Sequence, residues 1–374
     1  MRPRGWLILA PYIVERRVGG RPVFVSLDPL ARGRSAVVAT AAVRDVLGQF
    51  QRGADVGEVA RSVPRVARSG WAEAVERLAS AGLLVGPASL DGAPPSLELE
   101  ITNRCNADCV MCPRRELRPL GSMTEVTFQA VEALSRLAGG AILSGIGEPT
   151  LHPRLAEWCG RLHAALPAAA PLVVVTNGAR MTPALLDGLA AGGVSLVQFS
   201  LHALDTELAN TIMGWSRHEV AHRNFVDCAR HRPDLLAVNM VLLDANAGEV
   251  ERMRSFLAGL GLPAGRLGVI PAFSRAGSVD AAVLPLGRTV PAAGHCLYLR
   301  KSLFIAWTGD LLPCSNDIRG RHPWGNVTAV EPAEVVRHWW SELALAPAGF
   351  DMCRACDHHT RGALPTGWFE AVPR

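Results

Sequence analysis

Apolar residues recur with helical spacing through most of the first hundred residues, after an initial β-prone stretch. Residues 6–14 and 22–27 are apolar and flank Gly19-Gly20, which predicts a β-hairpin. Three amphipathic helices are predicted next, with these apolar faces: Val43, Val46, Leu47 and Phe50; Val56, Val59, Ala60 and Val63; Trp71, Val75, Leu78 and Leu83. A hairpin followed by three short helices predicts a winged-helix-like domain. Pro94 and Pro95 break both helix and strand, so we expect this domain to cover residues 1–95.

From residue 96 the pattern changes to short apolar strands that alternate with amphipathic helices. Such alternation is typical of βα units around a parallel sheet. The six predicted strands are residues 97–102, 141–143, 172–176, 196–200, 237–242 and 266–270. Six units predict an α/β fold with a partial (β/α)6 TIM-like barrel over residues 96–277, in which ligands bind at the carboxyl ends of the strands.

The regular alternation ends near Gly277, and residues 278–374 are rich in glycine, proline and cysteine. Residues 303–307 and 311–312 flank Thr308-Gly309-Asp310 and predict one hairpin. We expect this segment to form a small C-terminal domain held together by metal.

Composition restricts the environment of the protein. Of its 374 residues 49% are hydrophobic, which is enough for buried cores. No apolar run reaches the roughly 18 residues of a membrane span. Residues 1–10 are too short and too interrupted by arginine for a signal peptide. The sequence therefore predicts a cytoplasmic protein with no membrane partner.

The net charge of +4 is small and dispersed, which argues against a nucleic-acid partner. Its distribution is more informative, because residues 1–95 hold thirteen arginines against eight acidic residues. An anionic partner would suit this N-terminal part.

Seven of the nine cysteines fall into two spaced sets. Cytosolic reductants disfavour a disulfide framework, so metal ligation is the better interpretation. The first set is Cys105, Cys109 and Cys112; the second is Cys296, Cys314, Cys353 and Cys356. Cys159 and Cys228 stand apart on predicted outer helices, where a buried thiol acts as a small apolar side chain.

The first set lies in a loop that follows the first barrel strand. Three thiolates bind three irons of a cubane cluster and leave the fourth iron open to the amine and carboxylate of a methionine moiety. The alternative is a zinc site, which would normally need a fourth protein ligand that this trio does not supply.

This loop resembles the cluster motif of the radical S-adenosylmethionine (SAM) superfamily, and the resemblance extends from about Ser96 to Cys356. It implies a catalytic 4Fe-4S cluster, SAM, and an electron donor of the flavodoxin or ferredoxin type. Ser144-Gly-Ile-Gly-Glu-Pro149 resembles the motif that binds the methionine amine, and polar contacts are expected at the ends of the third and fourth strands. The implied SAM-binding residues are Met111, Gly145, Gly147, Glu148, Asn177 and Ser200.

Two positions depart from the pattern of the family. Met111 stands where many relatives have an aromatic residue beside the adenine, and methionine is adaptable enough to serve there. Met213-Gly214 stands where some relatives have Arg-Gly, so no arginine is assigned to the cofactor.

The second cysteine set resembles a twitch domain, the shortened form of the SPASM extension. The resemblance implies that Cys296, Cys314, Cys353 and Cys356 bind one auxiliary 4Fe-4S cluster. A structural zinc ribbon has the same number of ligands and is the alternative.

The N-terminal domain resembles precursor-peptide recognition domains, although other winged helices give a similar pattern. The radical SAM resemblance implies that SAM cleavage yields a 5′-deoxyadenosyl radical. Together with the N-terminal resemblance, it implies that this radical leads to oxidation or cross-linking of a ribosomally made precursor peptide. Epimerisation would need a cysteine in the barrel lumen. The alternatives are a dehydrogenase or epimerase of a small molecule such as an aminosugar, and a non-enzymatic zinc protein.

Overall fold

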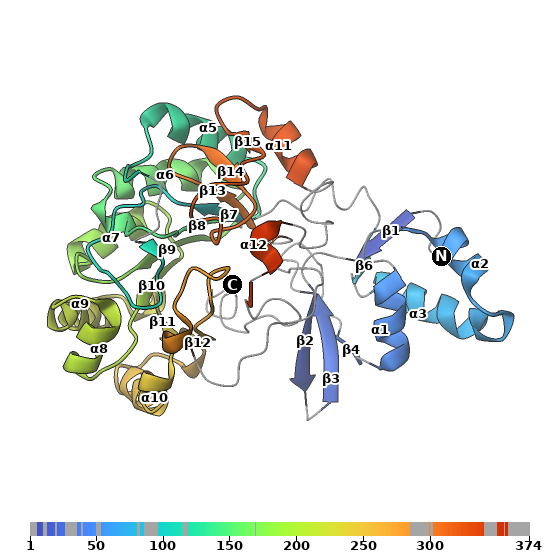
Figure 1. Cartoon of the computed structure of the whole chain (residues 1–374), viewed down its shortest axis with the longest axis horizontal. Helices are drawn as coiled ribbons and strands as arrows, with labels where there is room; N and C mark the ends of the chain where they lie inside the picture. Colours follow the sequence, from blue (N-terminus) through green and yellow to red (C-terminus); the bar gives the residue numbers. More distant parts are fainter. Residues whose placement is uncertain are drawn as a thin grey trace.

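The computed structural model describes residues 6–9, 13–18, 21–26, 36–38, 40–49, 54–80, 83–85, 96–114, 119–168, 170–284, 299, 302–339, 350–354 and 356–357. Figure 1 shows a helix-covered sheet formed by the middle and end of the chain, and a separate group of N-terminal elements. Each group has its own apolar cluster of buried side chains.

The N-terminal group contains the three predicted helices: α1 (Ala41–Gln49), α2 (Val56–Ser62) and α3 (Arg68–Ser80). Their predicted apolar faces meet in one cluster, in which Val75, Leu78 and Leu83 are almost completely buried. The Trp71 indole nitrogen donates a 2.7 Å hydrogen bond to Gln49 and so fastens α3 to α1. The amphipathic pattern is thus confirmed, except that Leu83 lies beyond the end of α3 at Ser80. Phe50 lies outside the described residues.

The N-terminal strands differ in part from the prediction. Strands β2 (Ile13–Val18) and β3 (Arg21–Ser26) form the hairpin around residues 19–20, and β4 (Ala36–Val38) pairs with β3. The expectation that residues 6–14 form one arm is wrong. Strand β1 (Trp6–Leu9) pairs instead with β5 (Ala54–Asp55) and β6 (Leu84–Val85).

Six parallel strands form the partial barrel, as predicted. In spatial order they are β7 (Ser96–Leu99), β8 (Gly140–Leu143), β9 (Leu172–Thr176), β10 (Leu196–Ser200), β11 (Leu236–Leu242) and β12 (Leu267–Pro271). Alternate side chains of each strand face the helices or the lumen. Leu97 and Leu99 of β7 belong to the large helix-side cluster, while Ile142 of β8 belongs to a separate lumen cluster.

The outer layer consists of α5 (Glu125–Ser135), α6 (Leu155–Ala165), α7 (Pro183–Ala191), α8 (Thr206–Met213), α9 (His218–His231) and α10 (Glu249–Gly259). Thr124, Thr182 and Asp205 each accept a backbone hydrogen bond at a helix N-terminus, which explains where α5, α7 and α8 begin. Phe128 of α5 stacks on Trp158 of α6, with the ring centroids 4.0 Å apart, and both are buried.

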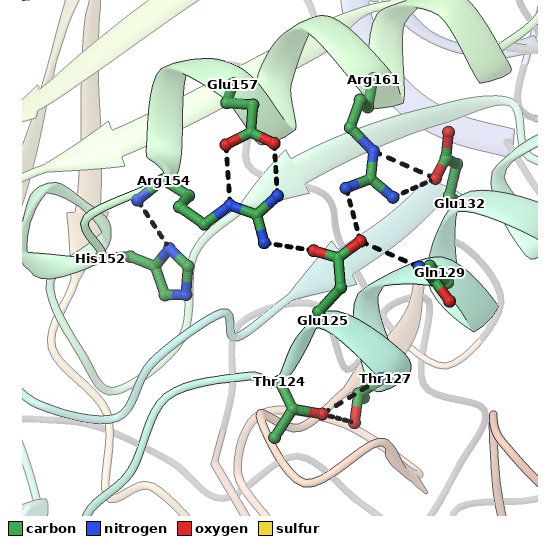
Figure 2. A network of polar contacts seen from close by, with 9 residues as sticks. All are labelled: Thr124, Glu125, Thr127, Gln129, Glu132, His152, Arg154, Glu157 and Arg161. Carbon is green, nitrogen blue, oxygen red and sulfur yellow. Dashed lines mark hydrogen bonds and ion pairs between the residues drawn. The ribbon is translucent and has the colours of Figure 1, made fainter.

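On the outer surface a network of charges also joins α5 to α6 (Figure 2). Glu125 pairs with both Arg154 and Arg161, and Arg161 also bonds Glu132 at 2.6 Å. The hydrogen bond from Arg161 holds the pKa of Glu125 below its usual value. Because these side chains are partly exposed to solvent, the network contributes less to stability than the aromatic stack beneath it.

The C-terminal part extends the barrel sheet. Strand β13 (Ser302–Ile305) pairs in parallel with β7, and β14 (Asp310–Leu312) and β15 (Gly325–Asn326) follow antiparallel. The hairpin predicted over residues 303–312 is confirmed, whereas its pairing with β7 was not predicted. Short helices α11 (Pro332–His338) and α12 (Asp351–Arg354) complete the described chain. No helix within the described ranges has the length and apolarity needed to cross a bilayer.

Candidate functional site

The loop that carries the first cysteine set begins after β7 and is braced by the end of α8. Asp108 N and Val110 N donate to the carbonyl oxygens of Met213 and Ile212, at 3.0 and 2.9 Å. Gly214 caps α8 with a φ of 58°, and a Cβ there would lie 2.1 Å from the Asp108 carbonyl oxygen. Glycine at position 214 is therefore required by the close approach of the loop.

The positive charge near the three thiols, from Arg114 and Arg275, does not outweigh their burial. Burial raises the pKa of Cys105 to about 11 and also raises the pKa values of Cys109 and Cys112. A bound metal centre supplies further positive charge and deprotonates its thiol ligands. Among the described residues no three acidic, histidine or cysteine side chains converge on one ion, as a zinc site would require. A cubane differs, because each cysteine binds a separate iron, so the trio fits a cluster.

The glycine-rich loop after β8 packs against the end of β7. The buried Glu100 carboxylate accepts a 3.2 Å hydrogen bond from Ile146 N. Gly145 has a φ of 138°, and a Cβ on Gly147 would lie 2.0 Å from the Thr102 carbonyl oxygen. Both glycines therefore allow the loop to approach the segment that follows β7, and their contacts with SAM stay predictions.

The Glu148 carboxylate is buried and has four protein donors. One oxygen accepts from Thr150 N at 3.1 Å and from the Thr150 and Thr176 hydroxyls, both at 2.7 Å; the other accepts from Asn177 N at 2.7 Å. Burial raises its pKa, and these hydrogen bonds oppose the rise. A carboxylate accepts roughly four hydrogen bonds, so most of the hydrogen-bonding capacity of Glu148 is taken up by the contacts that join the β8 loop to β9. Its contact with the methionine amine stays a prediction.

The other predicted SAM-binding residues lie around the cluster loop. Asn177 follows β9 and donates a 2.7 Å hydrogen bond to Asn106, which is next to Cys105. Met111 is buried in an apolar cluster with Ile212, Leu243 and Ala272. Ser200 ends β10 and is half-buried. Their contacts with SAM also stay predictions.

Three other residues with titratable side chains, Cys159, Cys228 and His202, are structural. Cys159 and Cys228 are buried in the helix-side core, as predicted, and burial raises the pKa of each thiol to about 12. His202 accepts a 3.1 Å hydrogen bond from Val241 N, and burial lowers its pKa to about 4. A neutral, bonded imidazole and two thiols outside the lumen take no direct part in the site.

The second cysteine set is described at three of its four members. Cys314, Cys353 and Cys356 are buried, whereas Cys296 lies outside the described residues. Cys356 N donates to the Cys353 carbonyl oxygen at 3.3 Å, which closes the short segment between these two cysteines.

A turn after β12 contacts the segments of the second set and was missed by sequence reasoning. Arg275, Ala276 and Gly277 have φ values of 48°, 58° and 85°. Ser274 donates two 2.7 Å hydrogen bonds, from N and Oγ, to Asp357, which follows Cys356. Arg275 donates at 3.2 Å to Asn316, two residues after Cys314. Only Gly277 signalled this turn in the sequence.

The partial parallel barrel and the three-cysteine loop after its first strand are the features expected of a radical SAM domain. Residues 99–257 match the Radical SAM superfamily. This part of the chain is thus a radical SAM domain, and the family implies SAM and one 4Fe-4S cluster as cofactors.

Several proteins are similar to the chain. The GTP 3′,8-cyclase 1 of Pseudomonas aeruginosa is 35% identical over 29% of this chain and 34% of its own length. The PqqA peptide cyclase of Ruegeria pomeroyi is 30% identical over 43% of each chain. The chain spans about half or less of the length of the curated relatives it matches. Streptococcus suis SuiB, solved with the precursor peptide SuiA, shares the fold at 12% identity with a TM-score of 0.55, over 96% of this chain and 95% of SuiB.

Proposed function

We propose that the protein is a radical SAM enzyme that oxidises or cross-links a ribosomally synthesised peptide. When bound, a reduced 4Fe-4S cluster supplies the electron that cleaves SAM to methionine and a 5′-deoxyadenosyl radical, which abstracts a substrate hydrogen. The observation that carries this proposal is the braced loop of Cys105, Cys109 and Cys112 beside the Asn177 and Glu148 network.

A peptide substrate is supported by the N-terminal domain and by the relatives. Strand β2 is an edge of its three-stranded sheet and pairs only with β3 within the described residues. An edge strand accepts an extended peptide by strand addition, and the arginine surplus of residues 1–95 favours an acidic leader. The names of the PqqA peptide cyclase and of the SuiB complex with SuiA also point to peptides.

An oxidative outcome is supported by the positions of the single cysteines. Epimerisation needs a thiol that returns hydrogen to the substrate radical inside the lumen. Cys159 and Cys228 lie in the helix-side core instead. We further propose that Cys296, Cys314, Cys353 and Cys356 hold an auxiliary 4Fe-4S cluster that takes up the second electron, because four cysteines saturate the irons of one cube.

The first experiment is anaerobic reconstitution followed by assay of iron, sulfide and 5′-deoxyadenosine. Two clusters correspond to about eight irons per chain. The auxiliary cluster would be disproved if the wild-type enzyme held only about four irons and a variant with alanine at Cys105, Cys109 and Cys112 held none. Absence of 5′-deoxyadenosine from the reduced, fully loaded enzyme would disprove the radical reaction.

The second experiment separates peptide from small-molecule substrates. The chain is coexpressed with any short acidic open reading frame encoded beside its gene, and the product is analysed by mass spectrometry. Loss of two hydrogens from that peptide is expected, together with loss of turnover when residues 1–95 are deleted. A small-molecule substrate, which the GTP 3′,8-cyclase relative favours, would leave the peptide unmodified.

A further inference from the structure

Strand β7 places a buried carboxylate on the lumen side of the barrel. Its neighbours in the sequence, Leu97 and Leu99, face the helices. Glu98 lies on the opposite face and is in register with Ile142, a member of the lumen cluster. On its other side it is in register with Phe304 of β13. Only 6% of Glu98 is exposed, so this acidic side chain is enclosed by the barrel.

Glu98 differs from the other buried carboxylates of the site. Glu100 accepts a hydrogen bond from Ile146 N, and Glu148 has four donors. Within the described part of the chain no hydrogen-bond donor reaches the Glu98 carboxylate. Burial of a carboxylate without donors costs free energy, which a ligand with its own donors would recover.

Two more polar side chains face the lumen, from strands that are three and four positions away from β7 in the sheet. Gln198 of β10 is in register with Ala237 of the lumen cluster and is 3% exposed. Asn239 of β11 is 9% exposed, and its side-chain oxygen has no hydrogen-bond partner among the described atoms. Gly268 of β12 leaves room beside both, because an added Cβ would lie 3.6 Å from the Asn239 oxygen and 4.0 Å from the Gln198 nitrogen. The lumen thus offers another acceptor that lacks a donor.

The charges around Glu98 show which donor it suits. The nearest opposite charge is Arg275 in the turn after β12, which lowers the pKa of Glu98 but forms no ion pair with it within 4.0 Å. The Arg275 guanidinium contacts other groups instead: it lies 4.6 Å from the Phe273 ring centre and donates a hydrogen bond to Asn316. Glu100 adds a second negative charge nearby. A neutral donor would leave Glu98 without a countercharge, whereas a cation would supply one.

We propose that Glu98 binds the substrate and accepts a hydrogen bond from a cationic nitrogen, an ammonium or a guanidinium, on the group held in the barrel lumen. This inference rests on the proposed function and specifies its substrate as one with a basic side chain or amino group at the reacting segment. Asn239 accepts a further hydrogen bond from the same group or from its neighbour.

The test uses side-chain analogues, because the natural substrate is not needed to detect the preference. Full-length enzyme, anaerobically reconstituted and loaded with SAM, is titrated with n-butylammonium, n-propylguanidinium and butyrate, and binding is measured by saturation-transfer NMR. We expect both cations to bind wild-type enzyme more tightly than butyrate. In Glu98→Gln their binding should weaken about tenfold, as for loss of a charge-assisted hydrogen bond.

Glu157→Gln is the matched control, because it removes an exposed carboxylate on α6. It should leave cation binding unchanged. Butyrate binding to wild-type enzyme as tightly as the cations would overturn the proposal, even if Glu98→Gln did not fold. Unchanged cation binding in folded Glu98→Gln would overturn it as well. Absence of 5′-deoxyadenosine would instead overturn the proposed function and leave the binding result standing.

Discussion

The helix-facing and lumen-facing sides of the parallel sheet are both buried, but they enclose different chemistry. On the helix side Leu99, Val174 and Phe199 join one large apolar cluster. On the lumen side a small apolar group lies beside the buried polar residues Glu98, Gln198 and Asn239. The same strands therefore contribute to two interiors of opposite character.

This difference separates stability from binding. Burial of apolar surface stabilises a fold by about 25 cal/mol per Å². A buried acceptor without a donor costs about 1–3 kcal/mol. The helix side thus holds the barrel together, while the lumen side carries polar groups that weaken the fold and are available to a ligand.

The largest contrast is expected between two cysteines, one in the cluster loop and one in the helix-side core. Cys109→Ala should abolish 5′-deoxyadenosine formation, because the cluster loses one of its three ligands. Cys159→Ala removes a thiol from the helix-side core and should keep both the iron content and the cleavage reaction. The measurements are iron analysis and chromatography of the nucleoside products. Cleavage that persists in Cys109→Ala would contradict the assignment of this loop.

Truncation of a large helix-side residue should affect stability first. Phe199 is fully buried and packs edge-on against Phe225, with 5.1 Å between ring centroids. Phe199→Ala should cost about 3–5 kcal/mol and lower Tm by roughly 10 °C, measured by thermal unfolding of the reconstituted enzyme. Val126→Ala is the control, because Val126 is 68% exposed. Equal Tm values for the two variants would show that the helix side is not the main core.

On the lumen side the expected effect is a dependence of stability on pH. Burial raises the pKa of Glu98 to about 7, against the lowering effect of Arg275 and with a further rise from Glu100. Because the folded pKa lies above the unfolded value of 4.5, Glu98 destabilises the fold as pH rises from about 4.5 to 7. The upper limit is about 3 kcal/mol.

The measurement is Tm at pH 5.5 and pH 8 in wild type and Glu98→Gln. Glu98→Gln should lose less stability over this interval than wild type. An identical decrease in both proteins would mean that Glu98 stays ionised, or stays neutral, throughout the interval.

The smallest effect is expected on the outer surface, at the charge network of α5 and α6. Arg161→Ala removes ion pairs to Glu125 and Glu132 and a contact 4.7 Å from the Phe128 ring centre. Exposed pairs contribute little, so Tm should fall by no more than about 2 °C, and less at high salt. A decrease as large as that of Phe199→Ala would place a major part of the stability in this network.

The local pattern of the chain predicted the barrel well. Strands β9 and β10 have the predicted bounds, because short apolar runs between polar turns mark buried parallel strands. The two cysteine sets were visible from spacing, and the apolar faces of α1 to α3 from helical periodicity. These features depend on residues that are close together in the sequence.

Features that depend on distant partners were not predictable. The pairing of β13 with β7 joins residues about two hundred positions apart, and no local pattern specifies it. Two of the four donors of Glu148 come from Thr176 and Asn177 at the end of β9, and the position of Arg275 depends on a left-handed turn that only Gly277 signals in the sequence. No local pattern marks Glu98 in the sequence, because its enclosure is a property of the partial barrel as a whole.

The pairing of β13 with β7 has a consequence for the synthesis of the protein. Strands β7 to β12 leave the ribosome in the order in which they pair, so this sheet can form as the chain grows. The free side of β7, next to the cluster loop, is covered only after residues 302–305 have emerged. Until then β7 is an open edge, which attracts other chains. Cells that make this protein should therefore lose more of it to aggregation when translation pauses between residues 270 and 302 than when it pauses later.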